Sequence, residues 1–158
     1  MTQRLDFSKL SPELLRKYYE FSMAVKSAVE PTIKHLVDLR ASQINGCAFC
    51  VDMHVKEAKI AGERELRLHH VAIWRESPLF DERERAALEW TEAVTRLGPH
   101  GVPDEIYDKV RGVLGDKALS DLSFAVMGIN GWNRLSIGFQ SVPGSMDGPY
   151  GLTKSGLS

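Results

Sequence analysis

Three side chains capable of redox or acid–base chemistry lie in one short stretch, A-S-Q-I-N-G-C-A-F-C-V-D-M-H from Ala41 to His54. This stretch holds both cysteines of the chain, Cys47 and Cys50, and His54 follows four residues after the second. If residues 47–61 form a helix, the spacing i, i+3, i+7 places the three side chains on one face. The pattern therefore predicts a histidine base beside a pair of thiols.

The surroundings of the cysteines favour a reactive thiolate. Asn45-Gly46 has the character of a helix start, where free backbone N–H groups stabilise a nearby anion. A free thiol with a pKa of about 8.5 is roughly 3% ionised at pH 7, but a histidine neighbour and a helix start can lower that pKa to about 7. At such a pKa, half of the thiol is present as the nucleophile.

Helical spacing also bears on whether the two cysteines can pair. The Cβ atoms of i, i+3 neighbours lie about 5–6 Å apart, whereas a relaxed disulfide needs about 3.5–4.5 Å. A bond between Cys47 and Cys50 should therefore form only at a loosened first turn, and it should be easily reduced. Such a bond suits cycling between two redox states rather than permanent crosslinking.

The composition is that of a single cytoplasmic domain spanning residues 1–158. Of its 158 residues, 43% are hydrophobic and 26% are charged, and the formal net charge is -1, which is ordinary for a globular protein of this size. Basic residues are interspersed with acidic ones, so we expect no nucleic-acid partner. The sequence shows neither the apolar core of a signal peptide nor a run long enough to span a membrane. In a reducing cytoplasm, a lone C-x-x-C is typically catalytic or metal-binding.

Apolar residues recur at helical spacing, and no segment alternates with the period of two that marks a strand. Helix starts are marked by Ser11-Pro12, by Pro31, and by Asp81 with Glu84, a pair with the form of a capping box. We therefore predict an all-α bundle of about six to seven helices. The expected helices cover approximately residues 12–30, 31–45, 47–61, 63–74, 82–97, 103–114 and 118–140.

Two further expectations concern burial and the C-terminal end. The first helix should bury Leu14, Tyr18, Phe21, Val25 and Val29 as one stripe, and the last should turn Leu122, Val126, Ile129, Trp132 and Ile137 inward. From Val142 onward, prolines and glycines favour a tail that is extended or disordered, or that lies along a partner subunit.

The string S-Q-I-N-G-C-A-F-C-V-D-M-H from Ser42 to His54 resembles the alkyl hydroperoxidase D (AhpD)-like or carboxymuconolactone decarboxylase family. The likeness continues through Lys56-Glu57-Ala58, and I-N-G-W-N-R-L from Ile129 to Leu135 resembles small members of the same family. The resemblance implies an all-helical fold that assembles as a homo-oligomer, either a trimer or a hexamer. It also implies a thiol peroxidase. We expect no bound cofactor or metal.

The resemblance assigns a role to each reactive residue. Cys50 would attack the peroxide, Cys47 would resolve the resulting sulfenic acid, and His54 would relay protons. The order is supported by the spacing, since His54 is one turn from Cys50 and two turns from Cys47. The family pattern ends the relay on a glutamate twelve residues before the first cysteine, where this chain has His35. We therefore expect either that His35 replaces that glutamate in the relay or that the peroxidase activity is weaker. A plain surface or core histidine is the third alternative. Asp38 and Glu30 are carboxylates near that position in the sequence, but neither occupies it.

The expected reaction consumes an organic hydroperoxide and leaves a Cys47–Cys50 disulfide. An external dithiol, either a lipoyl-bearing protein or a thioredoxin-like donor, would reduce it again. Phe49, Trp74 and Trp132 are candidate walls of an apolar substrate pocket, although aromatic residues are more often core or subunit contacts.

Other interpretations of the same residues stay open. The cysteines could be small core residues, or they could bind zinc with His54 and either His69 or His70. A decarboxylase acting on a carboxylated lactone is the nearest enzymatic alternative, but that reaction has no need for paired cysteines. A redox-sensing module that oxidises once, without turnover, is a further possibility.

Overall fold

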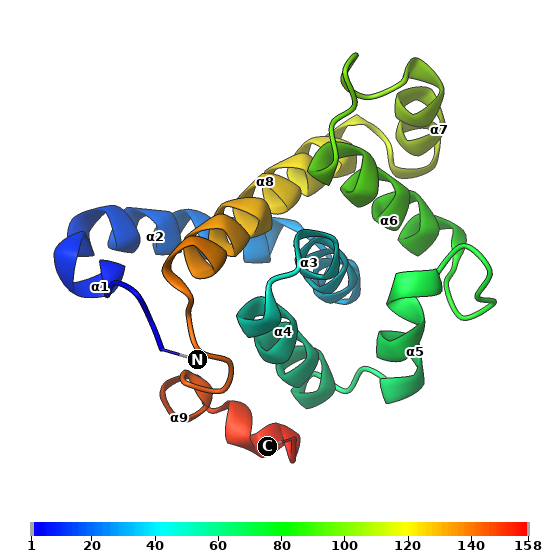
Figure 1. Ribbon diagram of the computed structural model, residues 1–158. Coiled ribbons are helices and arrows are strands. Elements are labelled where there is room, and N and C mark those ends of the chain that lie inside the picture. The colour runs from blue at the N-terminus through cyan, green and yellow to red at the C-terminus, as the bar shows by residue number, and fades with distance from the viewer. Residues whose placement is uncertain (1, 158) are drawn as a thin grey trace.

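A computed structural model describes residues 2–157, and within this range the regular structure is helical apart from one isolated bridge between Gly98 and Gly101 (Figure 1). The all-α prediction is therefore confirmed. The elements are α1 (Phe7–Leu10), α2 (Pro12–Ala28), α3 (Pro31–Asn45), α4 (Ala48–Ile60), α5 (Glu65–His70), the 3₁₀ turn η1 (Val71–Ile73), α6 (Glu82–Thr95), α7 (Asp104–Leu114), α8 (Asp116–Phe139), α9 (Asp147–Tyr150) and the 3₁₀ turn η2 (Leu152–Ser155).

Local signals in the sequence account for several of these boundaries. Pro12 and Pro31 begin α2 and α3, where proline lacks only an N–H that would have no helical partner. At the start of α6, the Asp81 side chain accepts from the Glu84 N–H and the Glu84 side chain accepts from the Asp81 N–H, both at 2.9 Å. The predicted capping box is therefore confirmed. The predicted helix over residues 63–74 is shorter, because η1 replaces its final turn.

Helix α3 lies at the centre of the bundle and supplies both halves of the core. Ile33 and Val37 pack into one apolar cluster with buried side chains of α6, α7 and α8. Leu36 and Leu39 pack into a second cluster with residues of α4, α5 and α6. Burying such a leucine or isoleucine stabilises the fold by about 1.5–3 kcal/mol, so the path of α3 is fixed from two sides.

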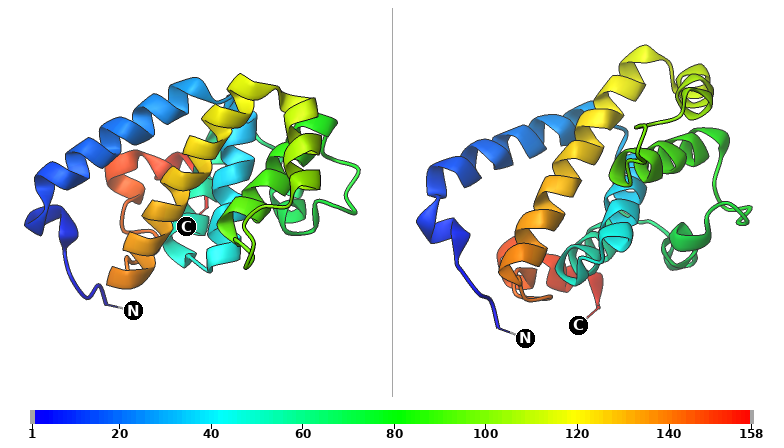
Figure 2. Two further views of the ribbon diagram at one scale, coloured as in Figure 1. Left: turned by 90° about the horizontal axis from the view of Figure 1, so that it is seen from above. Right: turned by 45° about the horizontal axis from the view of Figure 1, so that its top comes forward.

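Helices α1 and α2 form an arm at one side of the molecule, away from α5 to α7 at the other (Figure 2). The arm is held to α8 by Tyr18, whose ring lies 4.7 Å from that of Trp132 and whose hydroxyl donates to the Gly128 carbonyl at 2.7 Å. Gly131 makes this approach possible, because a Cβ at that position would lie 1.9 Å from the tyrosine Oη.

The burial predicted for the two long helices is only partly correct. Leu14 on α2 is 71% exposed, and Val25 is the buried member of the stripe expected there. On α8, Leu122, Val126 and Ile129 are buried as predicted, but Ile137 is 44% exposed. Helix α2 packs mainly against α8 and α1, so several of its apolar side chains have nothing to cover them.

The C-terminal segment is neither extended nor disordered, contrary to the expectation from its prolines and glycines. It turns back along α4, forms α9 and η2, and buries Leu152 to 3% exposure. The buried Lys56 ammonium of α4 holds the segment, since it bonds Asp52 on its own helix and Asp147 of α9 at 2.7 Å. Asp52 also accepts from the Gly144 N–H at 3.0 Å. The contacts of Lys56 with Asp147 and of Asp52 with Gly144 join residues remote in sequence, so local composition could not reveal them.

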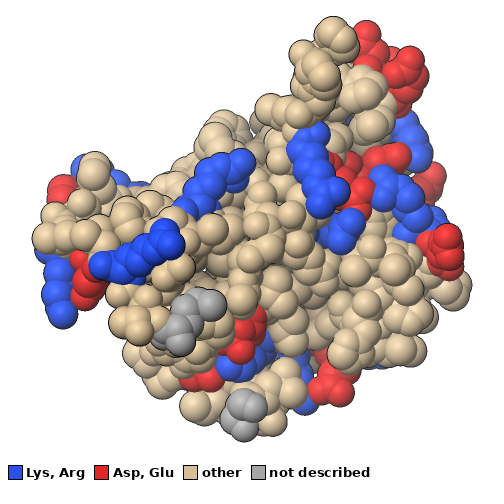
Figure 3. Space-filling model, viewed as in Figure 1, with Lys and Arg blue, Asp and Glu red and all other residues tan. Residues whose placement is uncertain are grey.

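No helix within residues 2–157 combines the length and apolar character needed to cross a bilayer. On the face shown in Figure 3, lysine and arginine side chains lie among aspartate and glutamate side chains around the rim.

Candidate active site

The two cysteines lie at the junction between α3 and α4. Gly46 ends α3 with φ of 71°, a left-handed conformation that glycine adopts without a Cβ clash. Cys47 follows with an extended backbone and is the N-cap of α4, and its N–H donates to the Ser42 carbonyl at 3.0 Å. Asn45-Gly46 is therefore the end of one helix rather than the start of the next, which corrects the interpretation from sequence.

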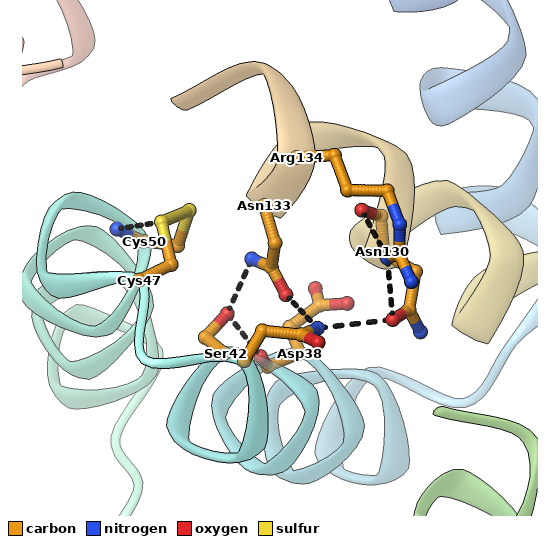
Figure 4. The surroundings of a disulfide bond; sticks show 8 residues. Asp38, Ser42, Cys47, Cys50, Asn130, Asn133 and Arg134 are labelled. Carbon is orange, nitrogen blue, oxygen red and sulfur yellow. Dashed lines mark hydrogen bonds between the residues drawn. A yellow bond between two sulfur atoms is a disulfide. The ribbon is translucent and has the colours of Figure 1, made fainter. Parts of the chain in front are cut away.

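Cys47 and Cys50 form a disulfide, and their Cα atoms are 5.3 Å apart (Figure 4). The pairing is possible because Cys47 precedes the first helical residue, so the two cysteines escape the fixed spacing of helical neighbours. The Cys47 sulfur also accepts from the Cys50 N–H at 3.3 Å. Each cysteine is only 1% exposed. The Cys47–Cys50 pairing is confirmed. It does not require the loosened first turn that we expected, because Cys47 lies at the N-cap and the Val51 N–H still donates to its carbonyl at 2.9 Å.

His54 lies one turn after Cys50 on α4 and is 7% exposed. Its Nδ1 is 2.9 Å from the Glu57 Oε2 atom, and its Nε2 is buried without a hydrogen-bond partner among the described residues. An N–H on Nδ1 donating to Glu57 assigns the tautomer whose Nε2 carries a lone pair. A carboxylate that holds one imidazole nitrogen and leaves the other free as a base is the arrangement that activates nucleophiles in many enzymes.

Glu57 supplies the negative charge that the sequence analysis sought at residue 35. Burial alone would raise the pKa of the Glu57 carboxyl, but the hydrogen bond from His54 and the electrostatic influence of His54, Lys26 and His35 lower it below its ordinary value. The carboxyl is therefore ionised at neutral pH. Sequence analysis missed this role, although Glu57 is three residues after His54 and that spacing places the two side chains side by side.

Asp38 on α3 is a second carboxylate at the site. Its Oδ2 is 3.9 Å from the His54 Nδ1 and also pairs with the Lys34 ammonium one turn earlier. The Asp38 side chain is 6% exposed, compared with 33% for Glu57. Asp38 Oδ1 has no hydrogen-bond partner among residues 2–157. The imidazole is thus flanked by a half-buried and a buried carboxylate, from two different helices.

His35 lies on α3 and contributes to the wall of a surface cavity of about 630 Å³, with Pro31, Thr32, Gly62, Arg64 and Phe80 among the other lining residues. Burial lowers the pKa of His35, while the charges of Glu57 and Asp38 raise it and those of His54 and Lys34 lower it further. The charges around His54 therefore influence His35, which also lines the cavity. The cysteines do not line this cavity.

The remaining candidates from the sequence lie in other environments. Trp74 is a core residue whose indole N–H donates to Glu92, and the Trp132 N–H donates to Ser22. Phe49 is half-buried on the first turn of α4. His70 contacts the Ser77 hydroxyl at 3.0 Å, and His69 is exposed. Among the described residues, no group of three or more His, Cys, Asp and Glu side chains could hold a metal ion, and disulfide sulfurs offer no thiolate to zinc.

Comparison with known proteins identifies the family of the chain. A sequence profile of the carboxymuconolactone decarboxylase family matches residues 12–93. The uncharacterized protein YdfG of Bacillus subtilis is 37% identical over 138 residues, which cover 87% of this chain and 94% of YdfG.

Solved structures share the fold. A protein of unknown function from Agrobacterium tumefaciens, suggested to be the antioxidant defence protein AhpD, is 40% identical with a TM-score of 0.86, over 90% of this chain and 98% of that one. An AhpD-core, peroxidase-related protein from Ralstonia eutropha has a TM-score of 0.77 at 18% identity, over 87% of this chain and 74% of that one. At that identity, the likeness concerns the fold alone.

Fold and site together define an all-α protein with a C-x-x-C disulfide at a helix start and a histidine one turn further on. The chain belongs to the AhpD-like or carboxymuconolactone decarboxylase family, as the resemblance in sequence implied.

Proposed function

We propose that this protein is a thiol peroxidase that reduces organic hydroperoxides by cycling Cys47 and Cys50 between dithiol and disulfide. The observation that carries the proposal is the buried Cys47–Cys50 bond one turn from an imidazole whose Nδ1 is held by Glu57. A structural crosslink has no need for a base whose second nitrogen is left without a partner.

The reaction begins from the reduced pair. His54 Nε2 takes the proton of the Cys50 thiol, and the thiolate attacks the terminal oxygen of the hydroperoxide. The S–O bond forms as the O–O bond breaks, and the departing alkoxide takes the proton from His54 and leaves as the alcohol. Cys50 is then a sulfenic acid.

Cys47 completes the half-cycle. Its sulfur attacks the Cys50 sulfur, the S–S bond forms, and the sulfenic oxygen leaves as water with the proton of Cys47. The disulfide then accepts two electrons and two protons from an external dithiol, for which a lipoyl-bearing or thioredoxin-like protein is the proposed source. The chain's own residues supply every group in these steps apart from the peroxide and the dithiol.

In this proposal, His35 is the outer member of the relay. It lines the cavity and lies near Glu57, Asp38 and His54, so it can exchange protons between solvent and the buried cluster. The residue therefore takes the family glutamate's place in the sequence, while the glutamate's negative charge comes from Glu57 and Asp38.

The proposed setting is a cytoplasmic homo-oligomer, either a trimer or a hexamer. Exposed apolar residues support self-association through the N-terminal arm, because Leu10 is 67% and Leu14 is 71% exposed. Light scattering on purified protein should give a mass of three or six chains, whereas a monomeric mass would contradict this part of the proposal.

Mass spectrometry tests the chemistry. One equivalent of cumene hydroperoxide added to reduced protein should give a Cys47–Cys50 disulfide in wild type, and a dimedone-trapped sulfenic acid on Cys50 in Cys47→Ser. The matched Cys50→Ser variant should leave Cys47 unoxidised on the same timescale. Wild type that keeps two free thiols would reject the proposal.

A redox sensor that oxidises once is the second candidate, and it is favoured by the burial of both cysteines to 1% exposure. Repeated peroxide consumption in the presence of dihydrolipoamide or reduced thioredoxin distinguishes the two functions. A peroxidase turns over many equivalents, whereas a sensor stops after one.

A further inference from the structure

A chain of polar side chains joins α8 to the end of α3, directly before the cysteine pair. The Asn45 amide donates to Asn133 Oδ1 at 2.8 Å and to Asn130 Oδ1 at 2.9 Å. The Asn133 amide donates to the Ser42 hydroxyl at 3.0 Å, and that hydroxyl donates to the Asp38 carbonyl at 2.7 Å. Figure 4 shows Asn133 reaching from α8 towards Ser42 beside the disulfide.

The network is buried and fully satisfied at its centre. Asn133 and Ser42 are both 0% exposed, and Asn130 is 9% exposed. Arg134 adds a donor to the Asn130 side chain at 2.9 Å. A buried amide whose oxygen and nitrogen both have hydrogen-bond partners holds its neighbours in one geometry, because any displacement leaves polar groups unpaired.

Two residues of this network, Ser42 and Asn45, are directly connected to Cys47, one by a hydrogen bond and the other through the chain. Ser42, whose hydroxyl accepts from Asn133, also receives the Cys47 N–H at its carbonyl, 3.0 Å away. Asn45 is the last residue of α3 and precedes Cys47 by two positions. The network therefore fixes the backbone immediately before Cys47 from a separate helix, whereas Cys50 is fixed by α4 itself.

We infer that Asn133 is a positioning residue that keeps Cys47 beside Cys50 when the pair is reduced, and so favours the disulfide. The inference rests on the proposed redox cycling of the cysteines but not on peroxide as the oxidant. It also gives a role to the I-N-G-W-N-R-L segment, which the catalytic steps do not use.

The direction of the effect follows from the two redox states. In the disulfide state, the S–S bond itself holds Cys47 near Cys50, with or without the network. In the dithiol state, only the backbone holds Cys47 in place, so a loosened junction gains freedom in that state alone. Loss of the network should therefore stabilise the dithiol relative to the disulfide.

The test is the equilibrium between this protein and mixtures of reduced and oxidised dithiothreitol, measured by thiol alkylation and mass spectrometry. Asn133→Ala and Ser42→Ala should each lower the equilibrium constant for disulfide formation about tenfold, which corresponds to roughly 30 mV for a two-electron couple. Ser42→Ala changes little volume and keeps the carbonyl that receives the Cys47 N–H, so it remains informative if Asn133→Ala fails to fold.

Thr91→Val is the matched control. Thr91 is also 0% exposed, and its hydroxyl bonds the Ala87 carbonyl within α6 at 2.7 Å. This variant should lower the melting temperature without moving the redox equilibrium. Equilibrium constants for Ser42→Ala within twofold of wild type would overturn the inference and leave the proposed function standing. Wild type that cannot be reversibly reduced and reoxidised would overturn both.

Discussion

Replacing Glu57 by glutamine should slow the reaction of Cys50 with electrophiles about tenfold at neutral pH. The His54 Nδ1 lies 2.9 Å from the Glu57 carboxylate, and because that carboxylate is ionised the hydrogen bond is charge-assisted. Bonds of that kind contribute about 1.5–3 kcal/mol net, compared with about 0.5–1.5 kcal/mol for a neutral pair.

The substitution therefore removes about 1–1.5 kcal/mol from the imidazolium that accompanies the Cys50 thiolate, and 1.4 kcal/mol is about a factor of ten in the thiolate population. The loss should not be greater, because Asp38 remains 3.9 Å from the same nitrogen. Removing both carboxylates, in Glu57→Gln with Asp38→Asn, should cost more than either single change.

The assay is the rate of Cys50 alkylation by iodoacetamide in fully reduced protein, followed by peptide mass spectrometry from pH 5 to pH 9. Glu65→Gln is the control, because Glu65 is an exposed glutamate that pairs with Lys59 and lies outside the His54 cluster. A wild-type pH profile for Glu57→Gln, or an equal loss in Glu65→Gln, would refute the assignment of Glu57 as the carboxylate that holds His54.

Three further predictions concern stability. Leu152→Ala should lower the free energy of unfolding by about 2–5 kcal/mol in urea titrations, because Leu152 is 3% exposed. Leu14→Ala is the control, and at a site 71% exposed it should change the free energy of unfolding by less than about 0.5 kcal/mol. Gly131→Ala should destabilise the protein by about 1–3 kcal/mol, measured by calorimetry, because the new Cβ would meet the Tyr18 hydroxyl. Gly138→Ala, in open space on the same helix, should be neutral or stabilising in the same measurement. Burial lowers the pKa of His35 below its ordinary 6.5, so the unfolded chain binds that proton more readily and stability should fall as pH drops from 6.5 through the folded pKa. His35→Gln should flatten that part of the melting-temperature profile, and a slope like that of wild type would contradict the reasoning.

Helix boundaries were predictable wherever a local signal fixes them. Proline at the start of α3 and the reciprocal bonds of Asp81 and Glu84 depend on residues close in sequence, so the pattern is sufficient. The pairing of Cys47 with Cys50 was predictable for the same reason, because the two residues are only three positions apart. The error at Asn45-Gly46 arose because glycine also marks helix ends, and in this chain the left-handed Gly46 closes α3.

The carboxylates around His54 were harder to predict, because their role depends on which charges the fold buries together. Glu57 is adjacent to His54 by helical spacing, but charged residues are common on helices and spacing alone does not select one. Asp38 reaches His54 only because α3 and α4 pack against each other. The order of the C-terminal segment likewise depends on Lys56 and Asp147, which are 91 positions apart.

The attachment of that segment has a practical consequence for anyone handling the protein. Helix α4 carries His54 on one side and anchors the chain's final turns through Lys56 on another. A bulky fusion at the carboxyl end would therefore be attached next to the segment that packs on α4, the helix that begins at the reactive pair. A fusion at the amino end would be attached to the arm formed by α1 and α2. Purification handles belong at the amino end, and redox measurements on carboxyl-terminal fusions should be repeated after the handle is cleaved.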